Sequence, residues 1–304
     1  MERKLKGLLI ILLCTFLWAL NGNVGAWLFK EKAFSPQTLV PFRLLGSGLS
    51  LLVVNLLKNG PSSLKILRVK ANYPYLLTYA LIGVLLMQYS YFMAIFYSNA
   101  PTSTLIQYLG IFLITAYLAI GSRTLPSKQV FFSLFVSIGG VALLVTHGDL
   151  SQLAISSLAL FWGLLSCLGY ASANLAPIKL QAYYPSIDIV GPSMTLGGVT
   201  LLLVLRPDFS SLVWDLPASL GLLYCIFGGT LAPFTLFMEG QKRVGPQLSS
   251  IFSLTEAIFS TLIAVIIYKA SFHPMDYVGM AMILSALVVL SLDDSQKKTS
   301  ARSS

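Results

Sequence analysis

Long apolar runs alternate with short polar segments along the whole 304-residue chain. Because an α-helix rises about 1.5 Å per residue and the hydrocarbon core of a bilayer is about 30 Å thick, roughly 20 apolar residues suffice to cross it. Prolines fall in or beside the gaps between the runs, where they cost least, and the period-2 alternation of a barrel strand is absent. We therefore expect an all-α membrane protein. The pattern predicts ten membrane-spanning helices, at residues 7–29, 38–57, 75–96, 102–121, 129–146, 157–178, 189–205, 217–238, 248–268 and 274–292.

The composition also indicates a membrane protein. Hydrophobic residues make up 56% and charged residues 10% of the chain, with a mean hydropathy of +0.79, whereas a soluble protein carries roughly a quarter charged residues. The net charge of +9 does not point to nucleic acid, because the basic residues are spread over short loops instead of forming one patch. The partners that we expect are the lipid bilayer and a small-molecule substrate. The sequence leaves the oligomeric state open, a homodimer included.

The basic side chains are concentrated in alternate gaps between the predicted spans. Of the 20 Lys and Arg residues, fifteen fall on the side of the N-terminus, four fall on the other side and Arg43 lies inside a span. Cytoplasmic loops carry such an excess of Lys and Arg. We therefore predict a multi-pass protein of the plasma membrane with both termini cytoplasmic, which requires an even number of spans.

Five predicted spans followed by five more indicate a duplicated unit. An odd number of spans per unit forces the second copy to insert upside down, and such inverted repeats are typical of secondary transporters whose halves meet at a midplane site. Weak self-similarity agrees, because Trp18-Ala19-Leu20-Asn21 resembles Tyr170-Ala171-Ser172-Ala173-Asn174. We predict a first five-helix repeat at residues 1–148, an inverted second repeat at 149–292 and a disordered cytoplasmic tail at 293–304.

Five stretches distributed along the chain form a recognisable series: Leu17-Trp18-Ala19-Leu20-Asn21, Pro41-Phe42-Arg43, the junction from Tyr97 to Leu109, the glycine-containing stretch from Ser137 to Val145, and Leu254-Thr255-Glu256. In order and spacing they resemble the drug/metabolite transporter superfamily, of the EamA type, over essentially the whole chain. The chain departs from the family pattern at Gly110-Ile111 and Ala257, where the family often has proline. It also lacks the glutamate of the family's Gly-Glu-Arg before the fifth and tenth spans. The resemblance implies transport of a small metabolite, such as an amino acid, and export is the commoner direction.

Two charged residues lie well inside predicted spans, where each costs roughly 2.5–3.5 kcal/mol. At about 1.5 Å per residue, Arg43 lies about 10 Å from the outer boundary and Glu256 about 12 Å from the inner boundary. Their axial separation is then roughly 8 Å, so both side chains could face one midplane cavity. There Arg43 would hold a substrate carboxylate or orient a gate. Glu256 would bind an amine, pair with Arg43 or carry a coupling proton. Structural alternatives stay open: Arg43 could snorkel to the outer interface, and Glu256 could bond a neighbouring helix.

A larger set of aromatic and amide side chains also lies within the spans. Metabolite cavities are typically lined by aromatic groups with a few placed polar groups, and an aromatic face can hold a cation. The alternative for each member is ordinary helix packing with interhelical hydrogen bonds. The candidate substrate-binding residues besides Arg43 and Glu256 are Trp18, Asn21, Gln88, Tyr89, Gln107, Tyr108, Tyr170 and Asn174.

Other functional classes fit the sequence less well. The three cysteines lack C-x-x-C spacing, the two histidines are far apart in sequence and no Walker-type loop is present, so we expect no metal site, no cofactor and no direct use of ATP. One glutamate and one arginine are too few for an intramembrane enzyme, and a channel would need rings of similar side chains. Our prediction is a secondary transporter that uses alternating access, with Glu256 as a candidate proton carrier. An uncoupled facilitator fits the sequence equally well, and an importer is a further alternative.

Overall fold

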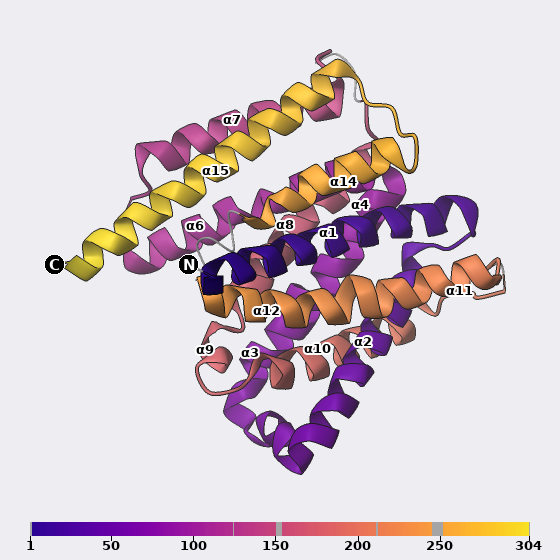
Figure 1. The fold of residues 1–304 in the computed structure, drawn as a ribbon. Helices are drawn as coiled ribbons and strands as arrows, with labels where there is room; N and C mark the ends of the chain where they lie inside the picture. Colours follow the sequence, from indigo (N-terminus) through magenta and orange to yellow (C-terminus); the bar gives the residue numbers. More distant parts are fainter. Residues whose placement is uncertain (1, 124, 150–153, 211, 245–251, 304) are drawn as a thin grey trace.

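The computed structural model describes residues 2–123, 125–149, 154–210, 212–244 and 252–303, and within these ranges all regular structure is helical (Figure 1). The first half of the chain forms α1 (Glu2–Glu31), α2 (Pro36–Asn59), η1 (Gly60–Arg68), η2 (Lys70–Asn72), α3 (Tyr73–Thr78), η3 (Tyr79–Leu86), α4 (Met87–Tyr97), α5 (Ala100–Tyr108), α6 (Gly110–Ser122) and α7 (Lys128–Thr146). The second half forms α8 (Ser157–Leu175), α9 (Ile178–Gln181), α10 (Ser186–Leu205), α11 (Leu216–Leu223), η4 (Tyr224–Leu231), α12 (Ala232–Val244), α14 (Thr255–Ile266) and α15 (Pro274–Ser303).

Eight helical runs in the described ranges are long and apolar enough to cross a membrane. They correspond to the first eight predicted spans. The apolar helices of the last two predicted spans are shorter, at Thr255–Ile266 and Pro274–Val289. The ninth predicted span starts at residues 248–251, which lie outside the described residues, so the total of ten stays a prediction.

Several of the predicted spans are not continuous α-helices within the described residues. The third and the eighth each contain a π-helical segment, η3 and η4. In η4 the Thr230 hydroxyl donates to the carbonyl oxygen of Cys225 at 2.9 Å, five residues earlier. The fourth span is divided into α5 and α6 at Leu109, whose N–H bonds the carbonyl of Ile106 at 3.1 Å in a tighter turn. π-helical segments are rare in proteins, and those that occur often lie at functional sites.

Helices from the two halves of the chain pack against each other throughout the bundle. The most extensive contacts pair α2 with α10, α7 with α15, α1 with α12 and α4 with α8. Glycine allows the closest approaches: a Cβ atom on Gly169 of α8 would lie 2.5 Å from the Cα of Met87. α7 and α15 run side by side along one flank of the bundle (Figure 1).

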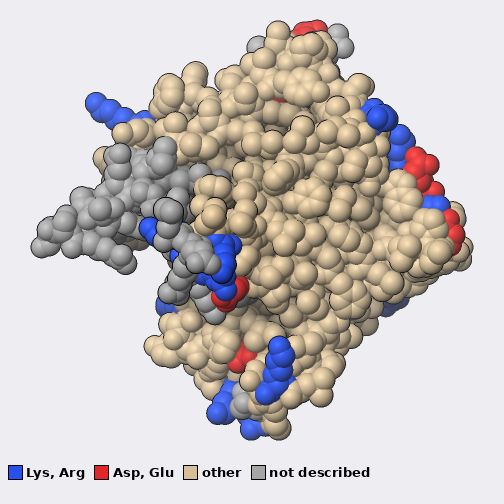
Figure 2. Space-filling view, in the orientation of Figure 1, with Lys and Arg blue, Asp and Glu red and all other residues tan. Residues whose placement is uncertain are grey.

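The outer surface of the bundle is apolar in a broad band. Large side chains such as Leu57, Ile120 and Phe135 are at least 78% exposed, which would be unfavourable in water over so large an area. Figure 2 shows the Lys, Arg, Asp and Glu side chains gathered at the two ends of the molecule, with an uncharged band between them. This surface is suited to lipid.

The start of α1 and the end of α15 lie at the same end of the bundle (Figure 1), which we call the proximal end, and α1 finishes at the distal end. α15 is helical through Ser303, which differs from the disordered tail predicted from residue 293.

Candidate functional site

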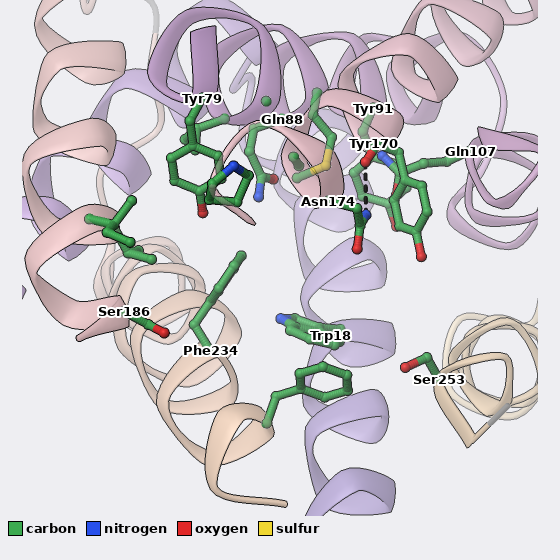
Figure 3. A pocket seen from close by; sticks show the side chains of 18 of the residues that line it. Trp18, Tyr79, Gln88, Tyr91, Gln107, Tyr170, Asn174, Ser186, Phe234 and Ser253 are labelled. Carbon is green, nitrogen blue, oxygen red and sulfur yellow. Dashed lines mark hydrogen bonds between the residues drawn. The ribbon is translucent and has the colours of Figure 1, made fainter. Parts of the chain in front are cut away.

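A cavity of about 350 Å³ lies between the two halves of the chain (Figure 3). It extends from Arg43 and Gln88 in the interior to Gln181 and Gln241 near the proximal end. Its volume is at the lower end of the range typical of small-molecule sites, roughly 300–1,000 Å³. Its walls come from α1, α2, η3, α4, α5, α8, α9, α10, α12 and α14, so it is formed by both halves.

Arg43 lies at the closed end of this cavity and is only 2% exposed. Its Nε donates to Thr230 Oγ1 at 2.6 Å and its Nη1 donates to Gln88 Oε1 at 3.0 Å. Its guanidinium also lies over the ring of Phe92, 4.7 Å from the centroid. The side chain is therefore held inside the bundle by polar and aromatic partners and does not snorkel to the interface, which favours a functional role for this buried cation.

Glu256 lines the same cavity from the start of α14. The Tyr108 hydroxyl lies 2.7 Å from Glu256 Oε2 and 3.1 Å from the carbonyl oxygen of Ser253, and it donates to these acceptors. The Tyr170 ring packs edge-on against the Tyr108 ring at 5.6 Å. Glu256 thus has a phenol as its direct partner, so Arg43 and Glu256 form two separate poles of opposite charge in one cavity.

Asn21 is an unpaired acceptor in the cavity wall. The residue is 2% exposed, and its Oδ1 is buried without a hydrogen-bond partner among the described residues. This atom is packed against Gly229 of η4, where an added Cβ atom would lie 2.3 Å from it. A buried acceptor without a donor is costly, so Asn21 Oδ1 is an unsatisfied group at the contact between α1 and η4.

The structure brings together most of the residues that the sequence singled out. Those that line the cavity are Trp18, Asn21, Arg43, Gln88, Gln107, Tyr108, Tyr170, Asn174 and Glu256. Tyr89 is not among them. Its ring packs edge-on against Trp162 at 5.7 Å instead, so helix packing accounts for it.

Other lining residues could not be predicted as a set. Tyr79 and Tyr91 lie in an apolar run, and Phe234 and Phe237 look like lipid-facing residues in the sequence. The rings of Phe234 and Phe237 lie 5.6 and 5.3 Å from that of Trp18 and form one wall (Figure 3). The polar residues at the proximal mouth fall at or beyond the predicted ends of the spans, and they are Gln181, Ser186 and Gln241.

The two histidines are brought together although they are far apart in sequence. Their ring centroids lie 5.4 Å apart, and His147 Nδ1 lies 2.5 Å from Asp276 Oδ1. Among the described residues, no three His, Cys, Asp or Glu side chains lie together as a group that could hold a metal ion. Cys14, Cys167 and Cys225 are buried free thiols.

The distal end of the bundle is closed by contacts between the halves. The ring of Phe34 packs edge-on against Trp214 at 5.5 Å, and Lys32 forms an ion pair with Asp215 at 2.5 Å. This hydrogen bond from Lys32 lowers the pKa of the Asp215 carboxyl. A second contact lies within the first half, where the Phe29 ring packs against Phe92 and Phe96 at 6.0 and 5.6 Å.

An apolar outer band, helices of membrane-crossing length and an internal polar and aromatic cavity define a multi-pass membrane protein with a small-molecule site. The comparisons identify the family. The chain belongs to the EamA-like transporter family, whose sequence profile matches residues 5–146 and 157–292. It is therefore a membrane transporter of small substrates, and the resemblance noted in the sequence is confirmed.

Two further comparisons agree. The "Uncharacterized inner membrane transporter YicL" of Salmonella typhimurium is 32% identical over 296 residues, covering 97% of this chain and 98% of that protein. A crystal structure superposes with a TM-score of 0.64 at 17% identity and covers 96% of each chain, which supports the fold alone. Family and relative both point to a transporter and not to an enzyme.

Proposed function

We propose that this protein is a secondary transporter that moves a zwitterionic or similarly amphiphilic small metabolite, such as an amino acid, across the plasma membrane by alternating access. The observation that carries the proposal is that Arg43 and Glu256 both line one cavity. Arg43 would hold a carboxylate, and Glu256 would hold an amine. The aromatic wall of Trp18 and Phe234 would contact the apolar part.

The architecture that we propose is ten spans in two inverted repeats, residues 1–148 and 149–292. The packing supports it. Suppose that spans one to five correspond to spans six to ten. The contact of α1 with α12 joins spans one and eight, and its counterpart joins spans six and three, which is the contact of α8 with α4. The contacts of α2 with α10 and of α7 with α15 each join two corresponding spans. The two stretches matched by the family profile and the π-helical segments in spans three and eight agree with the same division.

We further propose that the proximal end is cytoplasmic. The support is the distribution of Lys and Arg, which favours that end. A green fluorescent protein fused after Ser304 should then fluoresce in bacterial cells, whereas alkaline phosphatase fused there should be inactive. The cavity would in that case open to the cytoplasm, which agrees with loading for export.

The transport proposal is tested in proteoliposomes. A mixed pool of metabolites is offered for uptake and counterflow and is analysed by mass spectrometry. We expect saturable exchange of one compound class, which is lost in Arg43→Ala and kept in Lys128→Ala, because Lys128 is exposed at the start of α7 away from the cavity. If exchange persists in Arg43→Ala, the substrate does not bind at Arg43 in this cavity. If no member of the pool is exchanged by the wild type, the proposed substrate class is wrong.

A further inference from the structure

The sequences of the two proposed repeats can be aligned at two pairs of spans through a few identical residues. Aligning Tyr79 with Tyr224 in the third and eighth spans also aligns Gly83 with Gly228 and Phe92 with Phe237. Aligning Cys14 with Cys167 in the first and sixth spans aligns Asn21 with Asn174. These matches allow each contact at one end of the bundle to be assigned a counterpart at the other end.

The seam between the first and third spans is closed at the distal end. Phe29 of α1 packs edge-on against Phe92 and Phe96 of α4. Phe92 is fully buried, and Gln37 Nε2 approaches the Sδ of Met93 at 4.0 Å beside it. Three aromatic rings thus hold the start of the α1–α2 connection against α4.

The corresponding seam at the proximal end is open and differs in composition. The same sequence alignments match Phe29 with Ala182, Phe92 with Phe237 and Phe96 with Gln241. Ala182 is exposed, Phe237 packs on Trp18, and Phe237 and Gln241 line the cavity mouth. Only one of the three rings of the distal seam has an aromatic counterpart here.

We propose that these two seams are the gates of the transport cycle, and that their unequal composition makes the protein rest with the proximal end open. Closing the proximal gate would bring the α8–α10 connection at Ala182 against Phe237 and Gln241. That contact lacks the two ring–ring contacts that stabilise the distal gate, so it is the weaker of the two. The inference rests on the proposed alternating-access cycle.

The test changes each gate to the composition of the other. Ala182→Phe with Gln241→Phe gives the proximal gate three rings, and Phe29→Ala with Phe96→Gln removes two rings from the distal gate. Two reporter cysteines are introduced separately: Ser186→Cys lines the proximal mouth, and Met93→Cys lies in the distal seam, where Met93 is 5% exposed. Labelling by a membrane-impermeant maleimide is measured on intact spheroplasts and on inside-out vesicles. The same gate variants without a reporter give the background of the native buried thiols.

Both exchanges should shift the protein in the same direction. We expect labelling of Ser186→Cys to fall and labelling of Met93→Cys to rise. The ratio of the two should change by roughly two- to twelvefold for each ring contact exchanged. Ala116→Phe, which adds a ring at an exposed position on α6, should change neither. If both exchanged variants purify as folded protein and neither reporter changes, the gates are wrong.

The labelling does not depend on knowing the substrate, which separates the two proposals. If labelling of the reporters is unchanged in a protein that still exchanges metabolites, the proposed gates are wrong and the proposed transport function stands. Reporters that shift in a protein that exchanges no pool member would support the gates and overturn the proposed substrate class.

Discussion

Arg43 Nε donates to Thr230 Oγ1 at 2.6 Å, a bond that joins the second helix of the first half to the π-helical segment of the second half. The Thr230 hydroxyl can accept from Arg43 because it donates its own proton to the carbonyl of Cys225. The buried cation is thus fixed by a side chain whose position depends on a local departure from α-helical geometry.

The first prediction concerns this bond. Thr230→Val keeps the shape of the side chain and removes the acceptor, which leaves a buried guanidinium N–H unpaired. We expect the free energy of unfolding to fall by about 1–3 kcal/mol and substrate exchange to fall with it. Thr230→Ser restores the hydroxyl and should recover most of both. Thermal unfolding in detergent measures the first effect; a Thr230→Val protein as stable as the wild type would show that the bond contributes little.

The second prediction concerns the Tyr108–Glu256 pair. Tyr108→Phe removes the hydroxyl at 2.7 Å from Glu256 Oε2 and leaves a buried carboxylate without that donor. We expect a loss of about 1.5–3 kcal/mol in the free energy of unfolding. The loss should be smaller in a Glu256→Gln background, because the amide carries no charge. A double-mutant cycle measures the coupling, and strictly additive losses would mean that the pair is not coupled.

The third prediction concerns the driving force. If Glu256 carries a proton, Glu256→Gln should abolish accumulation driven by a pH gradient. Counterflow without a gradient should continue at a higher substrate concentration, because the variant also loses the charge that would hold the amine. Glu239→Gln is the matched control, because Glu239 is exposed on α12 and bonds Arg243. Accumulation that still follows the pH gradient in Glu256→Gln would exclude this residue as the carrier, and the protein would then be an uncoupled facilitator or would use another group.

The fourth prediction is a pH dependence at the distal end. The hydrogen bond from Lys32 lowers the pKa of Asp215 below its ordinary value of 3.8 in the folded state. A lowered folded-state pKa gives stability that is present above pH 3.8 and is lost as the pH falls through the lowered value. In Asp215→Asn this contribution should be missing at neutral pH, and the difference from the wild type should shrink below about pH 4. Thermal unfolding between pH 3 and pH 7 measures it, and a constant difference would contradict the assignment.

The fifth prediction concerns helix packing. Gly169→Ala would place a Cβ atom 2.5 Å from the Cα of Met87, so α8 and α4 would have to separate. We expect a loss of about 1–3 kcal/mol. Gly121→Ala is the control, because no atom lies within 4 Å of a Cβ there. Equal stability of the two variants would show that the α8–α4 contact is looser than described.

The sequence predicted the spans because hydrophobicity decides which segments enter a bilayer. It also predicted most of the cavity, because polar residues such as Asn21 and Gln88 inside an apolar run avoid lipid and turn inward. Tyr89 shows the limit of that reasoning, since an amphipathic ring such as this one packs equally well on Trp162.

Other features depend on tertiary structure. The π-helical segments leave no clear mark in hydropathy, so the role of Thr230 as the partner of Arg43 could not be predicted. The encounter of His147 with His273 depends on α7 and α15 lying side by side. In both cases residues far apart in sequence become neighbours through helix packing alone.

If the two halves are inverted repeats, as we propose, aligning Pro41 with Pro192 places Arg43 on Met194, and aligning Pro101 with Pro246 places Glu256 on Ile111. Neither ionisable group of the cavity then has a duplicate in the other half. Two identical halves would carry either two copies of each group or none. One chain with two unlike halves can instead present a single arginine and a single glutamate, and such a cavity is able to distinguish the two ends of a bound molecule.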